Sequence, residues 1–381
     1  MNRRIIAIDW MRGFVMVLMA IDHSSASFNA GRIAIDSAYL DPALVGGSYV
    51  PGDAFPLDQF LTRWITHLCA PTFLFLSGTS LALSTERRSE TGSSPGAIDR
   101  HLAIRAAVIL GLEAALSLLA MQEVLILQVL YAIGFSMLVM IPLRRLDTRW
   151  LLGLALAWLA FGEVITRSVA PLGEPVGFWN SLFFAAVYAS PVTVLYPVTG
   201  WLAMMMLGWC FGRHVLALPE GVAARDRLIR RVTVAGVAAL AIFVVLRGID
   251  GYGNMGLHRA DGSLVQWLHV SKYPPGLTYT LLELGGMAVC LSGFMRVERR
   301  LRGAPWRWNP LLVFGRTALF FYVLHIPLLG LLAMITTGGI AQAGLAETYV
   351  GTAAGLLLLY PLCIAYGRYK TAHPRSLAQY V

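Results

Sequence analysis

Three histidines that lie in separate apolar stretches are the residues best placed for chemistry: His23, His67 and His325. If each stretch is a helix that crosses a membrane, a rise of ~1.5 Å per residue puts all three histidines at a similar depth in the outer half of the membrane. Imidazole, with an unperturbed pKa of about 6.5, accepts a proton at neutral pH and returns it. A neutral histidine could therefore deprotonate a hydroxyl or amine as that group attacks a thioester. We predict that the three histidines converge. The sequence does not determine which of the three is the base. The alternative interpretation is that each histidine only contributes to helix packing.

Other polar residues are candidates for positioning a substrate or stabilising charge. Asp22 precedes His23 and is expected to orient a histidine ring, while Arg63 and the indole of Trp201 are candidates to stabilise an oxyanion. Tyr322 lies one turn before His325 and is a candidate substrate contact. Lys272, in Lys-Tyr-Pro-Pro at the expected outer end of a helix, could hold a phosphate or carboxylate. A topological anchor is the alternative for Lys272.

The first apolar stretch carries a polar stripe. Asp9, Arg12, Met16, Met19 and His23 are spaced by three and four residues, which places them on one helical face. Asp9 and Arg12 can form an ion pair at i,i+3, and Arg12 is also a candidate for binding substrate charge. A pair that only locks this helix against a neighbour is the competing interpretation.

These residues need helices that cross a bilayer to position them, and the composition predicts such helices. The chain has 57% hydrophobic residues, 13% charged residues and a mean hydropathy of +0.65, whereas soluble domains carry roughly 25% charged residues. We predict an all-α transmembrane bundle that forms a single domain over 1–381, with about ten spans. The expected spans are 5–22, 60–83, 102–120, 123–142, 150–166, 192–212, 231–247, 276–295, 311–332 and 348–367. The segment 178–191 is too short for a crossing and is expected to be interfacial or re-entrant.

The distribution of positive charge orients the predicted spans. Most of the 30 lysines and arginines fall on alternate connections, which predicts that these connections and both termini are cytoplasmic. The opposite connections, 23–59, 167–191 and 248–275, are long. Within these connections the lysines and arginines are Arg32, Arg167, Arg259 and Lys272, and Arg247 lies at the edge of the third. Topology thus explains the net charge of +9, and nucleic-acid binding is not predicted. The four cysteines lack the spacing of a zinc site, and no metal is expected.

Five blocks in order along the chain resemble a known family. They are Ile-Asp-Trp-Met-Arg-Gly-Phe at 8–14 with Met-Ala-Ile-Asp-His at 19–23, Ala-Pro-Thr-Phe-Leu-Phe-Leu-Ser-Gly at 70–78, Tyr-Pro-Val-Thr-Gly-Trp-Leu-Ala-Met-Met-Met-Leu-Gly at 196–208, Lys-Tyr-Pro-Pro at 272–275, and Phe-Gly-Arg-Thr-Ala-Leu-Phe-Phe-Tyr-Val-Leu-His at 314–325. Together they resemble the bacterial relatives of the heparan-α-glucosaminide N-acetyltransferase catalytic domain.

The resemblance implies a transmembrane acyltransferase, in a bacterial cytoplasmic membrane, that uses acetyl-CoA and acetylates a sugar amine or hydroxyl on the far side. One feature departs from the family pattern. The lysosomal enzyme has its catalytic histidine in a His-Ala-Ser-Trp-Asn-Gly context after the first family helix, and here the 23–59 connection has no histidine after His23. Either His23 or His67 has taken over the role, or the bacterial branch performs different chemistry.

The leading hypothesis is therefore transfer of an acetyl or other acyl group from cytoplasmic acyl-CoA to an extracytoplasmic glycan or sugar. The expected partners are the lipid bilayer, acyl-CoA and that acceptor, and a homodimer is left open. The alternative is a permease for a small anionic solute, with Arg12, Arg63 and Lys272 as binding charges. A non-catalytic scaffold is the third interpretation.

Overall fold

The computed structural model describes residues 5–34, 36–40, 55–121, 124–189, 191–301, 306 and 308–381. Part of the predicted connection 23–59, and Arg3, Arg4, Arg302 and Arg307 of the predicted cytoplasmic clusters, lie outside these residues. By its contacts the chain divides into two compact units, which are described separately. Unit 1 comprises 1–35, 45–69 and 286–381, and unit 2 comprises 36–44 and 70–285. The single domain over 1–381 stays a prediction.

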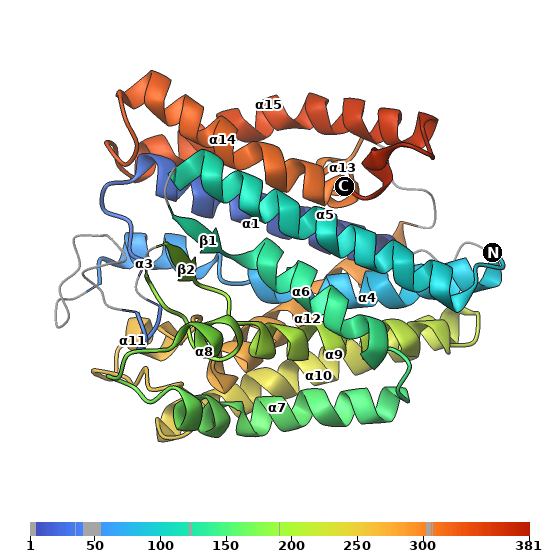
Figure 1. Cartoon of the computed structure of the whole chain (residues 1–381), viewed down its shortest axis with the longest axis horizontal. Coiled ribbons are helices and arrows are strands. Elements are labelled where there is room, and N and C mark those ends of the chain that lie inside the picture. The colour runs from blue at the N-terminus through green and yellow to red at the C-terminus, as the bar shows by residue number, and fades with distance from the viewer. Residues whose placement is uncertain are drawn as a thin grey trace. The chain divides into compact units, whose positions relative to one another are not determined.

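Unit 1 is helical and is built around the first helix. Its elements are α1 (Ile6–Phe28), α3 (Leu57–Trp64), the second part of α12 (Leu277–Arg300), α13 (Pro310–Arg316), α14 (Ala318–Thr337), α15 (Leu345–Ala372) and a 3-10 turn (Leu377–Gln379). Helix α1 packs against α13, α14 and α15 (Figure 1). The start of α1 is capped by the Glu298 carboxylate, which accepts hydrogen bonds from the backbone N–H groups of Ile6 and Ala7, both at 3.1 Å. A carboxylate is favourable there because the N-terminus of a helix carries partial positive charge.

Two glycines let α1 and α13 meet backbone to backbone. A Cβ atom on Gly13 would lie 1.9 Å from the carbonyl oxygen of Leu311, and one on Gly315 would lie 1.9 Å from that of Asp9. Small residues at such crossings are a common device for close helix packing in membranes. The Arg12 guanidinium also donates to the carbonyl of Gly315 at 3.1 Å, so the same crossing positions the polar stripe of α1.

We expect Gly13→Ala to destabilise unit 1 by about 1–3 kcal/mol or more, because the added methyl group meets rigid backbone. The measurement is the thermal unfolding midpoint in detergent, followed by tryptophan fluorescence. Gly153→Ala is the matched control: Gly153 lies inside a helix of unit 2, and its Cβ would meet nothing within 4 Å. An equal midpoint for Gly13→Ala and the wild type would contradict the backbone contact.

Unit 2 is also mainly helical. Its elements are α4 (Cys69–Glu90), α5 (Pro95–Met121), β1 (Leu125–Leu127), α6 (Val129–Leu143), α7 (Thr148–Val169), α8 (Phe178–Phe183), β2 (Val192–Val194), α9 (Val198–Leu216), α10 (Val222–Ile249), α11 (Leu264–Leu268) and the first part of α12. Glycines again allow close packing, since a Cβ on Gly78 would lie 2.0 Å from the carbonyl oxygen of Met205, and one on Gly208 would lie 1.8 Å from that of Phe75.

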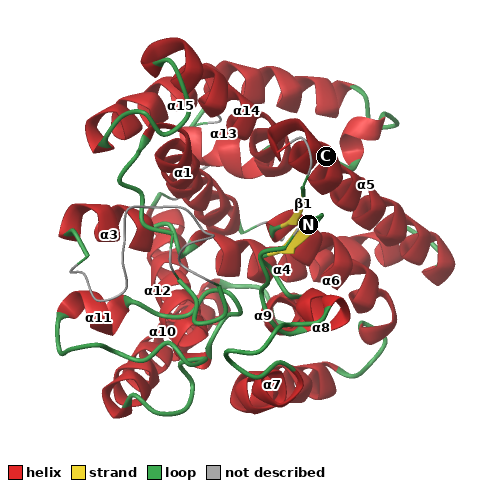
Figure 2. Cartoon of the chain, turned by 60° about the vertical axis from the view of Figure 1, so that its left-hand side comes forward, coloured by secondary structure: helices red, strands yellow, loops and turns green. Residues whose placement is uncertain are grey.

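Two short strands depart from the predicted helices. Strands β1 and β2 pair in parallel, with Leu125 opposite Val192 and Leu127 opposite Val194 (Figure 2). The predicted spans that begin at 123 and 192 are therefore wrong in their first residues. An apolar run is compatible with a buried strand as well as with a helix, and here pairing with a distant segment decides between them. The 60–83 span is also interrupted, by a turn at residues 65–68 between α3 and α4.

Seven helical segments of the described residues are long and apolar enough to cross a membrane. They are Leu57–Glu90, Pro95–Leu119, Thr148–Val169, Val222–Ile249, Leu277–Arg300, Ala318–Thr337 and Leu345–Ala372. This confirms a polytopic helical membrane protein, whereas ten spans and cytoplasmic termini stay predictions. Helix α8 has six residues, or ~9 Å of helix, so it cannot cross a hydrocarbon core of ~30 Å.

Candidate functional site

Two of the three predicted histidines are in direct contact in unit 1. His23 lies near the end of α1 and His325 in the middle of α14, and the packing of these helices brings Nδ1 of His23 to 2.5 Å from Nε2 of His325. The His325 ring is 0% exposed, whereas His23 is half-buried. The Tyr322 ring packs edge-on against both, with centroids 6.4 Å from His23 and 5.4 Å from His325. Of the pair, His23 is the ring that a substrate can reach.

The surroundings of His325 determine where the protons of the pair lie. Its Nδ1 is 2.7 Å from the carbonyl oxygen of Tyr322 and 3.1 Å from that of Phe321. Because a carbonyl only accepts, Nδ1 of His325 carries the proton, and Nε2 of the neutral ring has a lone pair. That lone pair accepts the Nδ1–H of His23. We therefore assign the remaining lone pair of neutral His23 to its Nε2 atom.

Asp22, beside His23, is held by two arginines. Its Oδ1 atom accepts hydrogen bonds from Arg63 at 2.7 Å and from Arg32 at 3.0 Å. The Arg63 side chain is 6% exposed, and Asp22 also interacts electrostatically with His325. Unit 1 thus gathers two imidazoles, one carboxylate and two guanidinium groups. The predicted role of Asp22 in orienting a ring stays a prediction, and the ring that lies against His23 belongs to His325.

The other candidate residues of unit 1 are His67, Asp9 and Arg12. His67 is 1% exposed in the turn between α3 and α4, four residues after Arg63. Its convergence with the other histidines stays a prediction. Asp9 and Arg12 form an ion pair of 3.2 Å, and Arg316 lies 3.8 Å from the same carboxylate. This group holds α1 against α13, in keeping with the structural interpretation of the polar stripe.

Unit 2 holds the two remaining candidates, Trp201 and Lys272. Trp201 is fully buried on α9, where its ring lies 4.7 Å from that of Tyr196 and 6.2 Å from that of Tyr279. Lys272 is 3% exposed, and its ammonium lies 5.2 Å from the centroid of the Tyr273 ring, within the range of a cation–π contact. These candidates therefore lie together in one aromatic environment.

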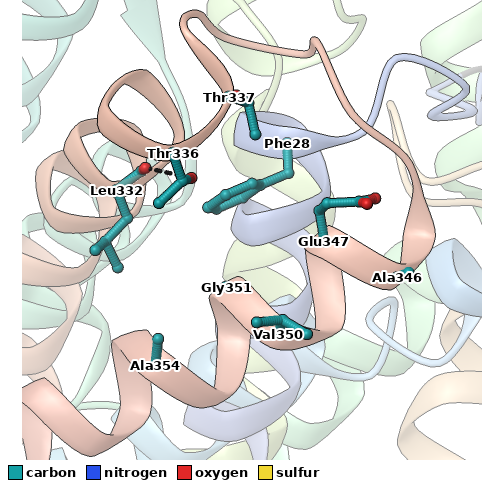
Figure 3. A pocket seen from close by; sticks show the side chains of 9 residues that line it. All are labelled: Phe28, Leu332, Thr336, Thr337, Ala346, Glu347, Val350, Gly351 and Ala354. Atoms are coloured by element: carbon teal, nitrogen blue, oxygen red, sulfur yellow. Dashed lines mark hydrogen bonds between the residues drawn. The ribbon is translucent and has the colours of Figure 1, made fainter.

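An apolar cavity of about 250 Å³ lies further along α1 and α14, in unit 1 (Figure 3). Phe28 projects into it from the end of α1, Leu332 and Thr336 line it from α14, and Val350 and Gly351 line it from α15. The Thr336 hydroxyl donates to the carbonyl of Leu332 at 2.7 Å, which reduces the polarity of the lining further. Since a sugar needs hydrogen-bonding partners, this cavity is not suited to a glycan.

Sequence reasoning missed the surroundings of three charged residues. Arg32 and Arg247 were interpreted as topological charges of external connections, yet Arg32 pairs with Asp22 and Arg247 is 0% exposed. Glu283, on α12, is 5% exposed and was not singled out. An interruption of an apolar run by a carboxylate was the one available signal for Glu283, since charge inside a membrane is costly.

Comparison with known families gives one match that covers more than half of the chain. The model described as heparan-alpha-glucosaminide N-acetyltransferase, catalytic, matches residues 48–247. The matched range includes Arg63, His67 and Trp201, while His23, Lys272 and His325 lie outside it. A search of curated proteins gives no match.

Proposed function

We propose a base, a donor and an acceptor for this chain, which belongs to the heparan-alpha-glucosaminide N-acetyltransferase catalytic family and is therefore a membrane-bound acyltransferase. The base is His23, the donor is acyl-CoA from the cytoplasm, and the acceptor is a hydroxyl or amine of an extracytoplasmic sugar. The observation that carries the proposal is the 2.5 Å contact between His23 and His325. We propose that the membrane is a bacterial cytoplasmic membrane, in keeping with the resemblance of the sequence blocks to bacterial relatives of the family.

The proton positions of the pair define the proposed step. Nε2 of His23 takes the proton of the acceptor hydroxyl or amine as its oxygen or nitrogen attacks the thioester carbonyl carbon. The new C–O or C–N bond forms, the C–S bond breaks, and the imidazolium returns its proton to the departing thiolate, which gives CoA–SH. Meanwhile Nδ1–H of His23 stays bonded to His325, which positions the ring and shares its charge.

The charged neighbours fit the same step. The imidazolium that forms on His23 is favoured by the nearby carboxylate of Asp22. Arg63 donates to Asp22 through one nitrogen, which holds its positive charge beside that carboxylate, and we propose that this charge stabilises the oxyanion of the tetrahedral intermediate. Arg63 therefore keeps its proposed role in oxyanion stabilisation, and Tyr322 is proposed to line the substrate approach to His23.

The proposal is tested with the full chain in proteoliposomes that carry labelled acetyl-CoA on one side and envelope glycans on the other. We expect labelled glycan, with release of one CoA thiol for each acetyl group transferred. Liposomes without protein are the control for leakage and spontaneous hydrolysis. Solute flux in the absence of coenzyme, without acetyl transfer, would contradict the proposal and favour the permease.

A further inference from the structure

Two buried polar groups of unit 2 lack a hydrogen-bond partner among the described residues. They are Oε1 of Glu283 and Nε1 of Trp201, and their side chains are 5% and 0% exposed. An unsatisfied polar group in a protein interior costs free energy, and in native proteins nearly every such group has a partner. One group is an acceptor and the other is a donor. A ligand that pairs with both must therefore donate and accept.

A chain of aromatic contacts connects these two groups. The Trp201 ring packs on Tyr196, whose ring lies 5.3 Å from that of Tyr273. Trp201 also meets Tyr279, with ring centroids 6.2 Å apart in an edge-to-face arrangement. Tyr279 and Glu283 are four residues apart on α12 and so share one face of that helix. The two unsatisfied groups thus belong to one aromatic-walled cluster.

The charge of this cluster selects among ligands. Glu283 interacts electrostatically with Lys272 and with Asp36, and the backbone N–H of Lys272 donates to the carbonyl of Asp36 at 2.8 Å. Two acidic side chains therefore accompany one ammonium, so the cluster has no surplus of positive charge that would hold a phosphate or carboxylate ligand. This argues against the anion-binding role considered for Lys272. An acyl chain would leave both polar groups unsatisfied.

We propose that this cluster binds the ring of a sugar, with one hydroxyl donating to Glu283 and another accepting from Trp201. A hydroxyl group both donates and accepts, and aromatic side chains suit the C–H groups of a sugar ring. Glu283 is then a specificity-determining residue. The binding of a sugar by this cluster does not depend on the proposed function.

The test is a titration of the full-length protein in detergent with methyl β-D-glucoside, followed by calorimetry, without acyl-CoA. Tetrahydropyran, the same ring without hydroxyl groups, is the matched probe. We expect the glucoside to bind more tightly than tetrahydropyran. Glu283→Leu and Trp201→Phe are each expected to raise the Kd of the glucoside at least about tenfold, since each removes one hydrogen bond. Trp201→Phe keeps an aromatic ring in place.

Glu163→Leu controls for the loss of a buried carboxylate in the same unit. Glu163 is 4% exposed, and its carboxylate accepts from the N–H groups of Gly253 at 2.7 Å and Met255 at 3.0 Å. We expect this variant to unfold at a lower temperature and to keep the wild-type Kd. Equal affinity for the two probes, or a wild-type Kd in either Glu283→Leu or Trp201→Phe, would overturn the proposal. Since the titration contains no donor, its result is independent of whether acyl transfer occurs.

Discussion

Replacing His23 with alanine is expected to lower kcat/KM for acyl transfer about 10²- to 10⁴-fold, the range that a general base contributes. The reason is that His23 is the half-buried member of the imidazole pair and has its lone pair on Nε2. The measurement is the rate of CoA release with acetyl-CoA and the acceptor identified in proteoliposomes. His373→Ala is the control, because His373 is an exposed histidine near the C-terminus.

The pair of His325 variants separates positioning from packing. His325→Gln retains an amide oxygen that can accept from His23 and an amide N–H that can donate to a helix carbonyl, whereas His325→Leu retains neither. We expect the glutamine variant to keep more activity than the leucine variant, at similar unfolding temperatures. Equal losses in both variants would indicate that His325 only packs. Full activity in His23→Ala would refute the assignment of the base.

The histidine pair shows how far sequence reasoning reaches. Matching depth in three apolar stretches pointed to His23, His67 and His325, because the rise of a helix converts residue number into depth. Depth, however, says nothing about which helices are neighbours. The contact depends on the packing of α1 against α14, and that packing is made by segments about 300 residues apart. For the same reason, the partners of Asp22 could not be predicted.

The blocks that carried the family resemblance turn out to be largely packing motifs. Gly13 of the first block and Gly315 of the last meet each other's helices backbone to backbone, and Gly78 and Gly208 do the same for α4 and α9. A glycine in an apolar run indicates such a close helix crossing, but it does not show which helix is the partner. The sequence therefore indicated the family and the helices, whereas the pairing of blocks became visible only in the fold.

Buried charges were the least predictable part of the site. The positive-inside rule treats an arginine in a connection as a solvated topological signal, and it gave that interpretation to Arg247. The structure instead buries this residue completely in the last turn of α10. A rule that counts charges per connection cannot distinguish a solvated arginine from a buried one. Only the folded loop supplies the hydrogen-bond acceptors that offset the cost of burying the charge.

Arg247 is expected to be the largest single contributor to the stability of the segment that leads to Lys272. Its guanidinium donates to Asp250 and Asn254, and to four backbone carbonyls, which belong to Leu257, Gln266, Trp267 and His269, over 2.6–3.3 Å. Arg247→Met would leave these carbonyls without a donor, at about 1–3 kcal/mol for each buried group. We expect cleavage within 251–269 by limited proteolysis, together with a lower unfolding midpoint.

Arg247→Lys tests whether charge alone is sufficient. A lysine ammonium has three donors at a single point, whereas the guanidinium reaches six acceptors through a planar fork, so we expect lysine to restore little of the protection. Arg230→Met, on the exposed face of the same helix, is the control and should match the wild type. Since this segment leads directly into the aromatic cluster, Arg247→Met should also weaken methyl β-D-glucoside binding. Resistance of Arg247→Met to protease would show that the loop is held by other contacts, and the arginine would then be a topological charge after all.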